Sequence, residues 1–173
     1  MYSGIFTRND NKRMGRVRAD TVIGGLAIAL VLSVGGTVRA QDGDRQHETA
    51  ARAALDEYFR AWNAADGAAV AAISNFPRLS LGQNGQVVVR ETPEEIVATD
   101  FDALKQSGWD HSTLDLAEAV HVSSDKVHFR IVFSRYSADG SPYTTVPGLY
   151  VITNQNGHWG LQLQSILPAT FTR

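Results

Sequence analysis

Apolar side chains recur at steps of three and four along residues 46–65, which is the spacing of one face of an α-helix. The chain then reaches Asp66 and Gly67, where the aspartate side chain can cap the first N–H groups of a second, short helix. We therefore expect two consecutive helices at the start of the folded region. The apolar stripe of the first consists of Ala51, Leu55, Tyr58 or Phe59, and Trp62.

Residues 92–108 carry the signals of one further helix. Thr92 is placed as its N-cap, with Glu95 three positions later to complete a capping box. Pro93 suits the first helical position, because its missing N–H would have no partner there. Gly108 is placed to end the helix.

The rest of the chain alternates between apolar and polar positions, as strands do. Residues 78–90 predict a hairpin around the pair Asn84-Gly85, which tolerates the positive φ angles of a tight turn. Short polar turns then separate β-rich runs, which indicates an antiparallel meander. These runs are residues 111–122, 126–136, 143–154 and 158–167.

Helices followed by a long sheet predict an α+β fold, namely a cone-shaped, curved antiparallel sheet covered by two to three N-terminal helices. The apolar face of the sheet needs a cover, and the stripe of the first helix can supply it. We expect Phe59 and Trp62 to fill the concave side, with Trp159 also in the core. The second helix then closes one end of the cone, and the other end remains a mouth.

Composition limits the chain to one domain, residues 41–173, because 173 residues are too few for two sizeable cores. The absence of cysteine excludes disulfides and thiolate metal sites.

The first 40 residues hold six of the 16 basic side chains and two of the 18 acidic ones, so the remainder has an excess of six acidic side chains. Such a body is a poor nucleic-acid binder, because phosphate contacts need clustered Lys and Arg.

Residues 1–40 have the order of a secretory signal peptide: a basic segment, an apolar run at residues 21–38, and small residues at a cleavage site. Val38 and Ala40 suit signal peptidase, which predicts a periplasmic or secreted protein beginning at Gln41. The alternative is an uncleaved anchor, the only route by which this domain would meet a membrane. Met14 competes with Met1 as the translation start.

The order of elements resembles the nuclear transport factor 2-like superfamily, particularly its SnoaL-like members, over about residues 48–167. The first helix ends in the aromatic-x-x-Trp pattern of Phe59 and Trp62, and the last strand begins with the Gly-x-Trp of Gly157 and Trp159. The resemblance implies a pocket-forming cone in a superfamily that includes isomerases, cyclases, dehydratases and members without chemistry. Two family features are missing: NFPRLSLG has no acidic base, and the histidine–aspartate pair of the dehydratases has no clear counterpart.

Strand alternation places Arg135 and Glu118 on the core face, where an unpaired charge is costly. The two could form an acid and an anion-binding cation inside a pocket. The alternative is an ion pair at the rim, or a β-bulge that turns Glu118 outward. His111 lies where a strand enters the mouth and is a candidate base, although Asp110 is expected to point the other way. Pocket-lining candidates are Tyr58, Trp62, Tyr136 and Tyr150.

Three functions remain open from the sequence. The first is an exported domain that binds a small apolar or amphipathic molecule without catalysis. The second is a SnoaL-like isomerase, lyase or cyclase that uses Glu118 or His111 as base. The third is an interaction module that forms a homodimer through the outer face of the sheet. No cofactor is predicted, and the scattered histidines predict no metal site.

Overall fold

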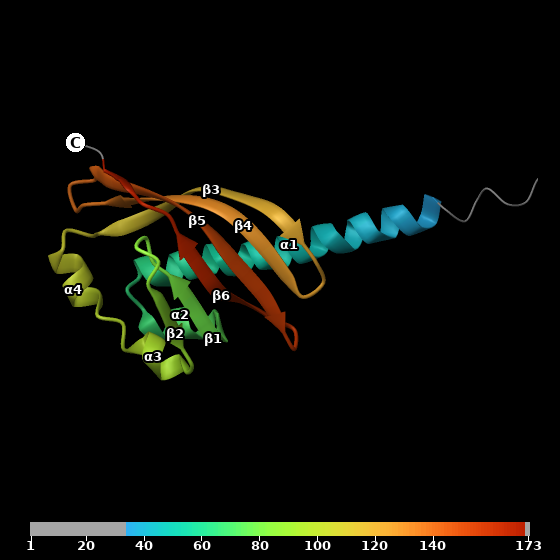
Figure 1. Cartoon of the computed structure of the whole chain (residues 1–173), viewed down its shortest axis with the longest axis horizontal. Helices are drawn as coiled ribbons and strands as arrows, with labels where there is room; N and C mark the ends of the chain where they lie inside the picture. The colour runs from blue at the N-terminus through green and yellow to red at the C-terminus, as the bar shows by residue number, and fades with distance from the viewer. Residues whose placement is uncertain (1–33, 172–173) are drawn as a thin grey trace, which may run out of the picture.

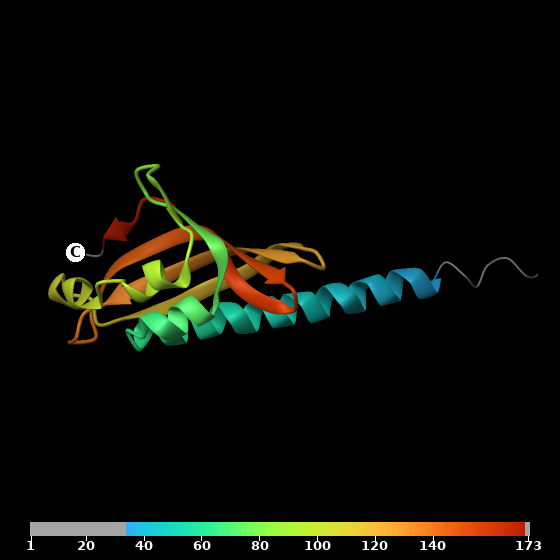
Figure 2. The same cartoon turned by 90° about the horizontal axis from the view of Figure 1, so that it is seen from below.

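One long helix lies across the concave face of a curved sheet in this computed structural model, which describes residues 34–171 (Figures 1 and 2). The helix, α1, runs from Val34 to Asn63. Helix α2 (Gly67–Ala72) follows after a tight turn, and the Asp66 carboxylate accepts a hydrogen bond from the Ala69 N–H at 2.9 Å. The predicted pair of helices and the aspartate cap are confirmed.

In the described residues the sheet has seven strands, six of them in the order β2-β1-β6-β5-β4-β3, and it is curved but not closed. The consecutive strands β3 to β6 pair antiparallel, which confirms the predicted meander and the α+β fold. The β1–β6 pair is parallel, and a short β7 (Thr170–Phe171) pairs with β5. The other strands are β1 (Ser74–Leu81), β2 (Val87–Arg90), β3 (His111–Val122), β4 (Lys126–Tyr136), β5 (Pro142–Gln155) and β6 (His158–Ile166).

The core lies between α1 and the concave face of β3 to β6. Leu55 is completely buried there, and the Phe59 ring packs edge-on against Phe133 of β4 with ring centroids 6.0 Å apart. Trp62 is only partly buried and packs against Phe101, with ring centroids 5.1 Å apart. Phe59 therefore fills the concave side as expected, whereas Trp62 stands at the edge of the core. Trp159 is also only partly buried.

The single helix expected at residues 92–108 is wrong, because the structure divides it into α3 (Pro93–Val97) and α4 (Phe101–Gln106). The Asp100 side chain accepts a hydrogen bond from the Ala103 N–H at 2.9 Å and begins a new helix at that point. Thr92 makes no side-chain cap bond. Gly108 follows α4 with a φ of +95°, a conformation that favours glycine and ends the helix as predicted.

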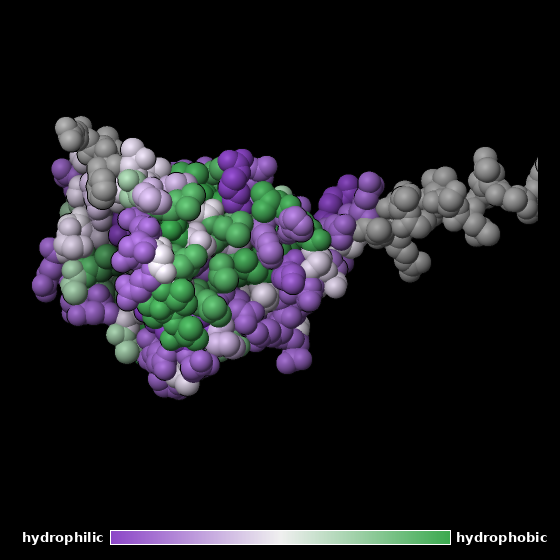
Figure 3. All heavy atoms as spheres, viewed as in Figure 1, coloured by the Kyte–Doolittle hydropathy of each residue, from purple (hydrophilic) through white to green (hydrophobic). Residues whose placement is uncertain are grey.

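The outer, convex face of the sheet carries hydrophobic side chains at its surface (Figure 3). Leu149 on β5 and Val120 on β3 are among the exposed ones. The homodimer expected through this face stays a prediction. Within the described residues no helix is long and apolar enough to cross a membrane. The expected leader, residues 1–40, lies mostly outside the described part of the chain.

Leu55→Ala tests the contact between α1 and the sheet. The leucine is 0% exposed, so its truncation leaves a cavity and should lower the free energy of unfolding by about 2–5 kcal/mol in urea denaturation. Leu167→Ala is the matched control, because Leu167 is 57% exposed and should change stability by less than about 0.5 kcal/mol. Equal effects in the two variants would show that α1 does not cover the core.

Candidate functional site

A hollow of about 160 Å³ lies between the C-terminal half of α1 and the concave face of the sheet. We call it the aromatic hollow, because five aromatic side chains line it. Its polar lining includes Ser80, Ser112, Arg135 and Gln164. Its aromatic lining consists of Tyr58, Phe59, Trp62, Phe133 and Tyr150.

A second hollow of about 250 Å³ adjoins the first. Arg78 of β1 and Arg90 of β2 line it, so we call it the arginine hollow. Ile96 of α3 and Val88 of β2 supply apolar lining. The two hollows together form one recess, since four residues line both of them: Trp62, Ser80, Gly82 and Gln164.

Arg78 is the most deeply buried charged group of the recess, at 3% exposed. Its Nη1 donates to Ser74 Oγ at 2.9 Å, and its Nη2 donates to Gln164 Oε1 at 2.6 Å and to the Tyr58 hydroxyl at 3.4 Å. The guanidinium carbon lies 5.1 Å from the centroid of the Tyr58 ring. These partners are all neutral, and Arg78 Nε is buried without an acceptor among the described residues.

Arg135 and Arg90 add two further guanidinium groups to the lining. Arg135 lies 5.7 Å from the centroid of the Phe133 ring. Within residues 34–171 the ion pairs engage other arginines or His111, and none joins Arg78, Arg90 or Arg135 to a carboxylate. The lining of both hollows contains no aspartate, glutamate or histidine. The recess is therefore positively charged, and no side chain in it is an obvious general base.

The rings of Tyr58 and Tyr150 pack edge-on beside this network, with their centroids 6.1 Å apart. Gln164 Nε2 donates to the Tyr58 hydroxyl at 3.0 Å. Burial raises the pKa of Tyr150 well above its ordinary value of 10.0, and the nearby Tyr58 raises it further. A hydrogen bond with Gln164 and the positive charges of Arg78 and Arg135 lower this pKa in part. Tyr150 therefore stays a neutral hydroxyl throughout the ordinary pH range.

Glu118 does not reach the recess. Strand β3 shifts register between Leu114 and Leu116, so its alternation is offset by one residue beyond that point. The Glu118 side chain is consequently about half exposed on the outer face, where Arg130 Nε donates to it at 2.9 Å. Glu118 and Arg135 therefore do not pair on the core face, and the alternative given above, a β-bulge that turns Glu118 outward, is the one that the structure shows. Arg135 does line the aromatic hollow as predicted from the alternation of β4.

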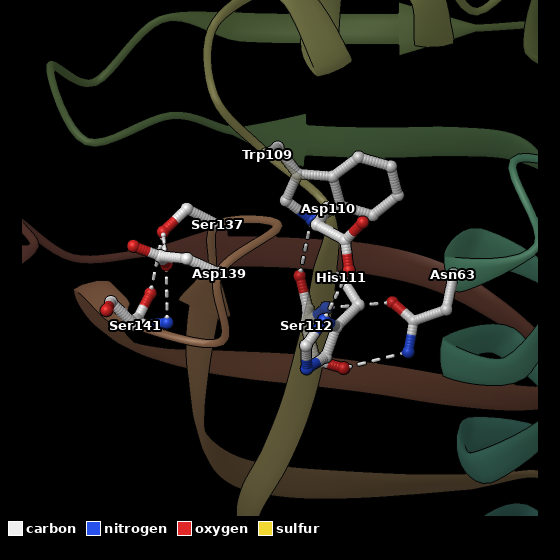
Figure 4. Close-up of polar contacts among 8 residues, drawn as sticks. All are labelled: Asn63, Trp109, Asp110, His111, Ser112, Ser137, Asp139 and Ser141. Carbon is white, nitrogen blue, oxygen red and sulfur yellow. Dashed lines mark hydrogen bonds and ion pairs between the residues drawn. The ribbon is translucent and has the colours of Figure 1, made fainter.

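His111 lies at the start of β3, next to Ser112 (Figure 4), and does not line either hollow. Its ring stacks on that of Tyr136, with centroids 4.9 Å apart and an interplanar angle of 6°. Its Nδ1 lies 2.8 Å from Asp110 Oδ2, so the expectation that Asp110 points away is wrong. Asp110 precedes the strand and does not follow its alternation. Tyr58, Trp62 and Tyr150 line the recess as expected, whereas Tyr136 does not.

Neighbouring side chains fix the entry of β3 into the fold. Trp109 Nε1 donates to Ser112 Oγ at 3.0 Å, and Asn63 exchanges two hydrogen bonds with the Ser112 backbone at 2.8 and 2.9 Å (Figure 4). The end of α1 is thereby tied to the first strand of the meander, which positions Ser112 in the wall of the aromatic hollow. Across the described residues no three His, Asp or Glu side chains are grouped as metal ligands would be.

Sequence reasoning did not identify Arg78, the most deeply buried charge of the site. The segment NFPRLSLG contains no acidic residue, and Arg78 is its one charged side chain. The sequence did contain a signal for this residue. Arg78 is the only charged residue of β1, and strand alternation places it on the same face as Ser80. The length of its side chain allows it to reach Tyr58 and Gln164, which no local pattern reveals.

The curved, unclosed sheet with helices on its concave face defines a protein of the nuclear transport factor 2-like (NTF2-like) class. Residues 47–163 match the model of the family described as NTF2-like protein (DUF6841), and the chain belongs to this family. The resemblance to the NTF2-like superfamily is thus confirmed. No curated protein sequence matches the chain.

Solved structures with the same fold come from proteins of different activities. An NTF2-like protein with a cystatin-like fold from Novosphingobium aromaticivorans superposes with a TM-score of 0.58, at 13% identity over 82% of this chain and 91% of that one. A hexachlorocyclohexane dehydrochlorinase from Novosphingobium barchaimii LL02 gives 0.56, at 14% identity over 76% and 92%. A ketosteroid isomerase-like protein from Erwinia carotovora atroseptica gives 0.51, at 19% identity over 69% and 93%. At these identities the likeness shows the fold alone.

Tyr150→Phe tests the burial of the Tyr150 hydroxyl. Because the folded-state pKa lies above 10.0, the unfolded tyrosine ionises first as pH rises, and unfolding then releases a proton. Above about pH 10 the free energy of unfolding of the parent should fall with pH more steeply than that of Tyr150→Phe, by about 1.4 kcal/mol per pH unit. Below that pH the free energies of the two proteins should change with pH in the same way. Urea denaturation between about pH 8 and about pH 11 measures the difference. Parallel curves over the whole range would contradict the buried, neutral hydroxyl.

Proposed function

We propose that this domain binds a small amphipathic molecule with one ring in the recess beneath α1. The observation that carries the proposal is the composition of the aromatic hollow, where five aromatic side chains surround a volume of about 160 Å³. An apolar cavity of about 150 Å³ is large enough to bind benzene. The polar groups of the adjoining arginine hollow supply contacts for a substituent on such a ring.

Binding without acid–base chemistry fits this lining better than catalysis does. Neither hollow is lined by a carboxylate or an imidazole. A general base must lie within hydrogen-bond reach of the proton that it removes. Tyr150 cannot serve at ordinary pH, because burial raises the pKa of its hydroxyl well above 10.0.

The isomerase, lyase or cyclase alternative rests on the Asp110–His111 pair. A carboxylate 2.8 Å from Nδ1 orients an imidazole as a general base would need. The His111 ring, however, packs against Tyr136 and does not line the recess. The enzyme hypothesis would require a substrate that extends from the recess to the start of β3. The enzyme hypothesis would be favoured over simple binding if the protein turned over a substrate and His111→Gln lost that turnover but still bound the substrate.

Export across a membrane is the second part of the proposal, and it rests on the sequence of residues 1–40. A basic segment followed by an apolar run and small residues is the signal that signal peptidase recognises. We expect the mature chain to begin at Gln41. Intact-mass measurement of the protein isolated from its native host tests this, and a mature chain that keeps residues 21–38 would mean an anchor in place of a cleaved signal.

Ser80→Leu tests ligand binding in the recess. Ser80 lines both hollows, so the larger side chain should occupy the space of the ligand and weaken binding by about tenfold or more. The assay is thermal shift and tryptophan fluorescence with single-ring compounds that carry neutral, anionic or cationic substituents, since a ligand of the folded state raises its melting temperature. Ser124→Leu, in the exposed β3–β4 turn, is the matched control. Failure of every compound to bind the parent would overturn the proposed function.

A further inference from the structure

The charge of the recess is opposite to that of the domain around it. Residues 41–173 hold more acidic than basic side chains, yet three arginines and no acidic residue line the recess. Arginine is rarely buried without a partner, because removal of a charge from water is costly. A lining with charges of one sign selects a ligand of the other sign.

Arg78 shows where that selection is strongest. It is buried, and the three groups that accept its hydrogen bonds (Ser74, Tyr58 and Gln164) are all neutral. They accept some of the hydrogen bonds that the guanidinium can donate, but they do not neutralise its positive charge. Its Nε has no acceptor within the described chain. A structural role alone would be served by a neutral side chain at less desolvation cost. The buried charge is therefore explained by an anion that enters from the arginine hollow.

Arg135 reaches the same region from the opposite side of the recess. It projects from β4 into the aromatic hollow, whereas Arg78 projects from β1, and Gln164 of β6 lies between the two strands in the lining. Arg78 lies 5.1 Å from the centroid of the Tyr58 ring and Arg135 lies 5.7 Å from that of the Phe133 ring, and both rings line the aromatic hollow. Two guanidinium groups beside one hollow can both contribute to neutralising one carboxylate, for which arginine has a matching planar geometry.

We propose that the recess selects an organic anion: a monocarboxylic acid with one aromatic ring, whose carboxylate is neutralised by Arg78 and Arg135 while its ring lies in the aromatic hollow. This inference rests on the proposed binding function and specifies its ligand class. Neutral and cationic molecules of the same shape are disfavoured, because they leave the buried guanidinium charge uncompensated. The volume of the aromatic hollow limits the apolar part to about one ring.

Three probes of nearly equal shape test the sign of the ligand: phenylacetate, phenylacetamide and 2-phenylethylamine. Isothermal titration of the whole mature chain should give a Kd for phenylacetate about 10- to 100-fold lower than that for phenylacetamide, and no binding of the amine. Equal Kd values for the acid and the amide would overturn the anion selectivity and leave the proposed function standing. Absence of binding by all three probes, and by the wider panel above, would overturn both.

Arginine variants test the residues that carry the selectivity. Arg135→Gln should reduce the preference for the acid over the amide by about tenfold, and Arg135→Lys should retain part of it because the charge remains. Arg78→Gln should abolish the preference; if it does not fold, Arg135→Gln decides alone. Arg130→Gln is the control, since Arg130 is 60% exposed and pairs with Glu118 on the outer face. An unchanged preference in Arg135→Gln, or an equal loss in Arg130→Gln, would overturn the assignment.

Discussion

The packing of helix α1 against the concave face of the sheet is the contact on which the rest of the structure depends. The meander β3 to β6 has an apolar inner face that must be covered, and Leu55 and Phe59 of α1 cover it. The sheet curves while the helix runs nearly straight (Figure 2). Their surfaces separate toward Trp62, and the recess occupies that space. The same contact thus stabilises the domain and creates the recess.

The chemistry of the recess follows from which polar side chains the strands bring into it. Arg78 and Arg135 enter from β1 and β4, and no acidic residue lines either hollow. Burial of Arg78 strengthens the field of its charge, because little water screens it. Such a lining suits the anion that we propose as its ligand. Neither hollow is lined by a carboxylate or an imidazole, and the fold by itself does not decide an activity.

Strand irregularities decide which residues belong to the site. Regular alternation would place Glu118 beside Arg135, yet a register shift after Leu114 turns it outward to Arg130. Asp110 lies just before β3 and is free of its alternation, so it meets His111. In the same way Asp100 begins a second helix within residues 92–108, where the sequence predicted a single helix. Each difference arises where a single hydrogen bond or one extra residue changes a regular period.

The sequence by itself determined the helices α1 and α2 and the antiparallel meander, because periodicity, caps and turn residues act over a few neighbouring positions. The NTF2-like fold was expected from a resemblance to that superfamily. The sequence also identified Tyr58, Trp62, Tyr150 and Arg135 as residues of the inner face. Only the tertiary structure decided that Arg78 is buried among Tyr58, Ser74 and Gln164, and that Glu118 faces solvent. These outcomes depend on contacts between segments about 20 to 86 positions apart and on strand register, neither of which a local pattern encodes.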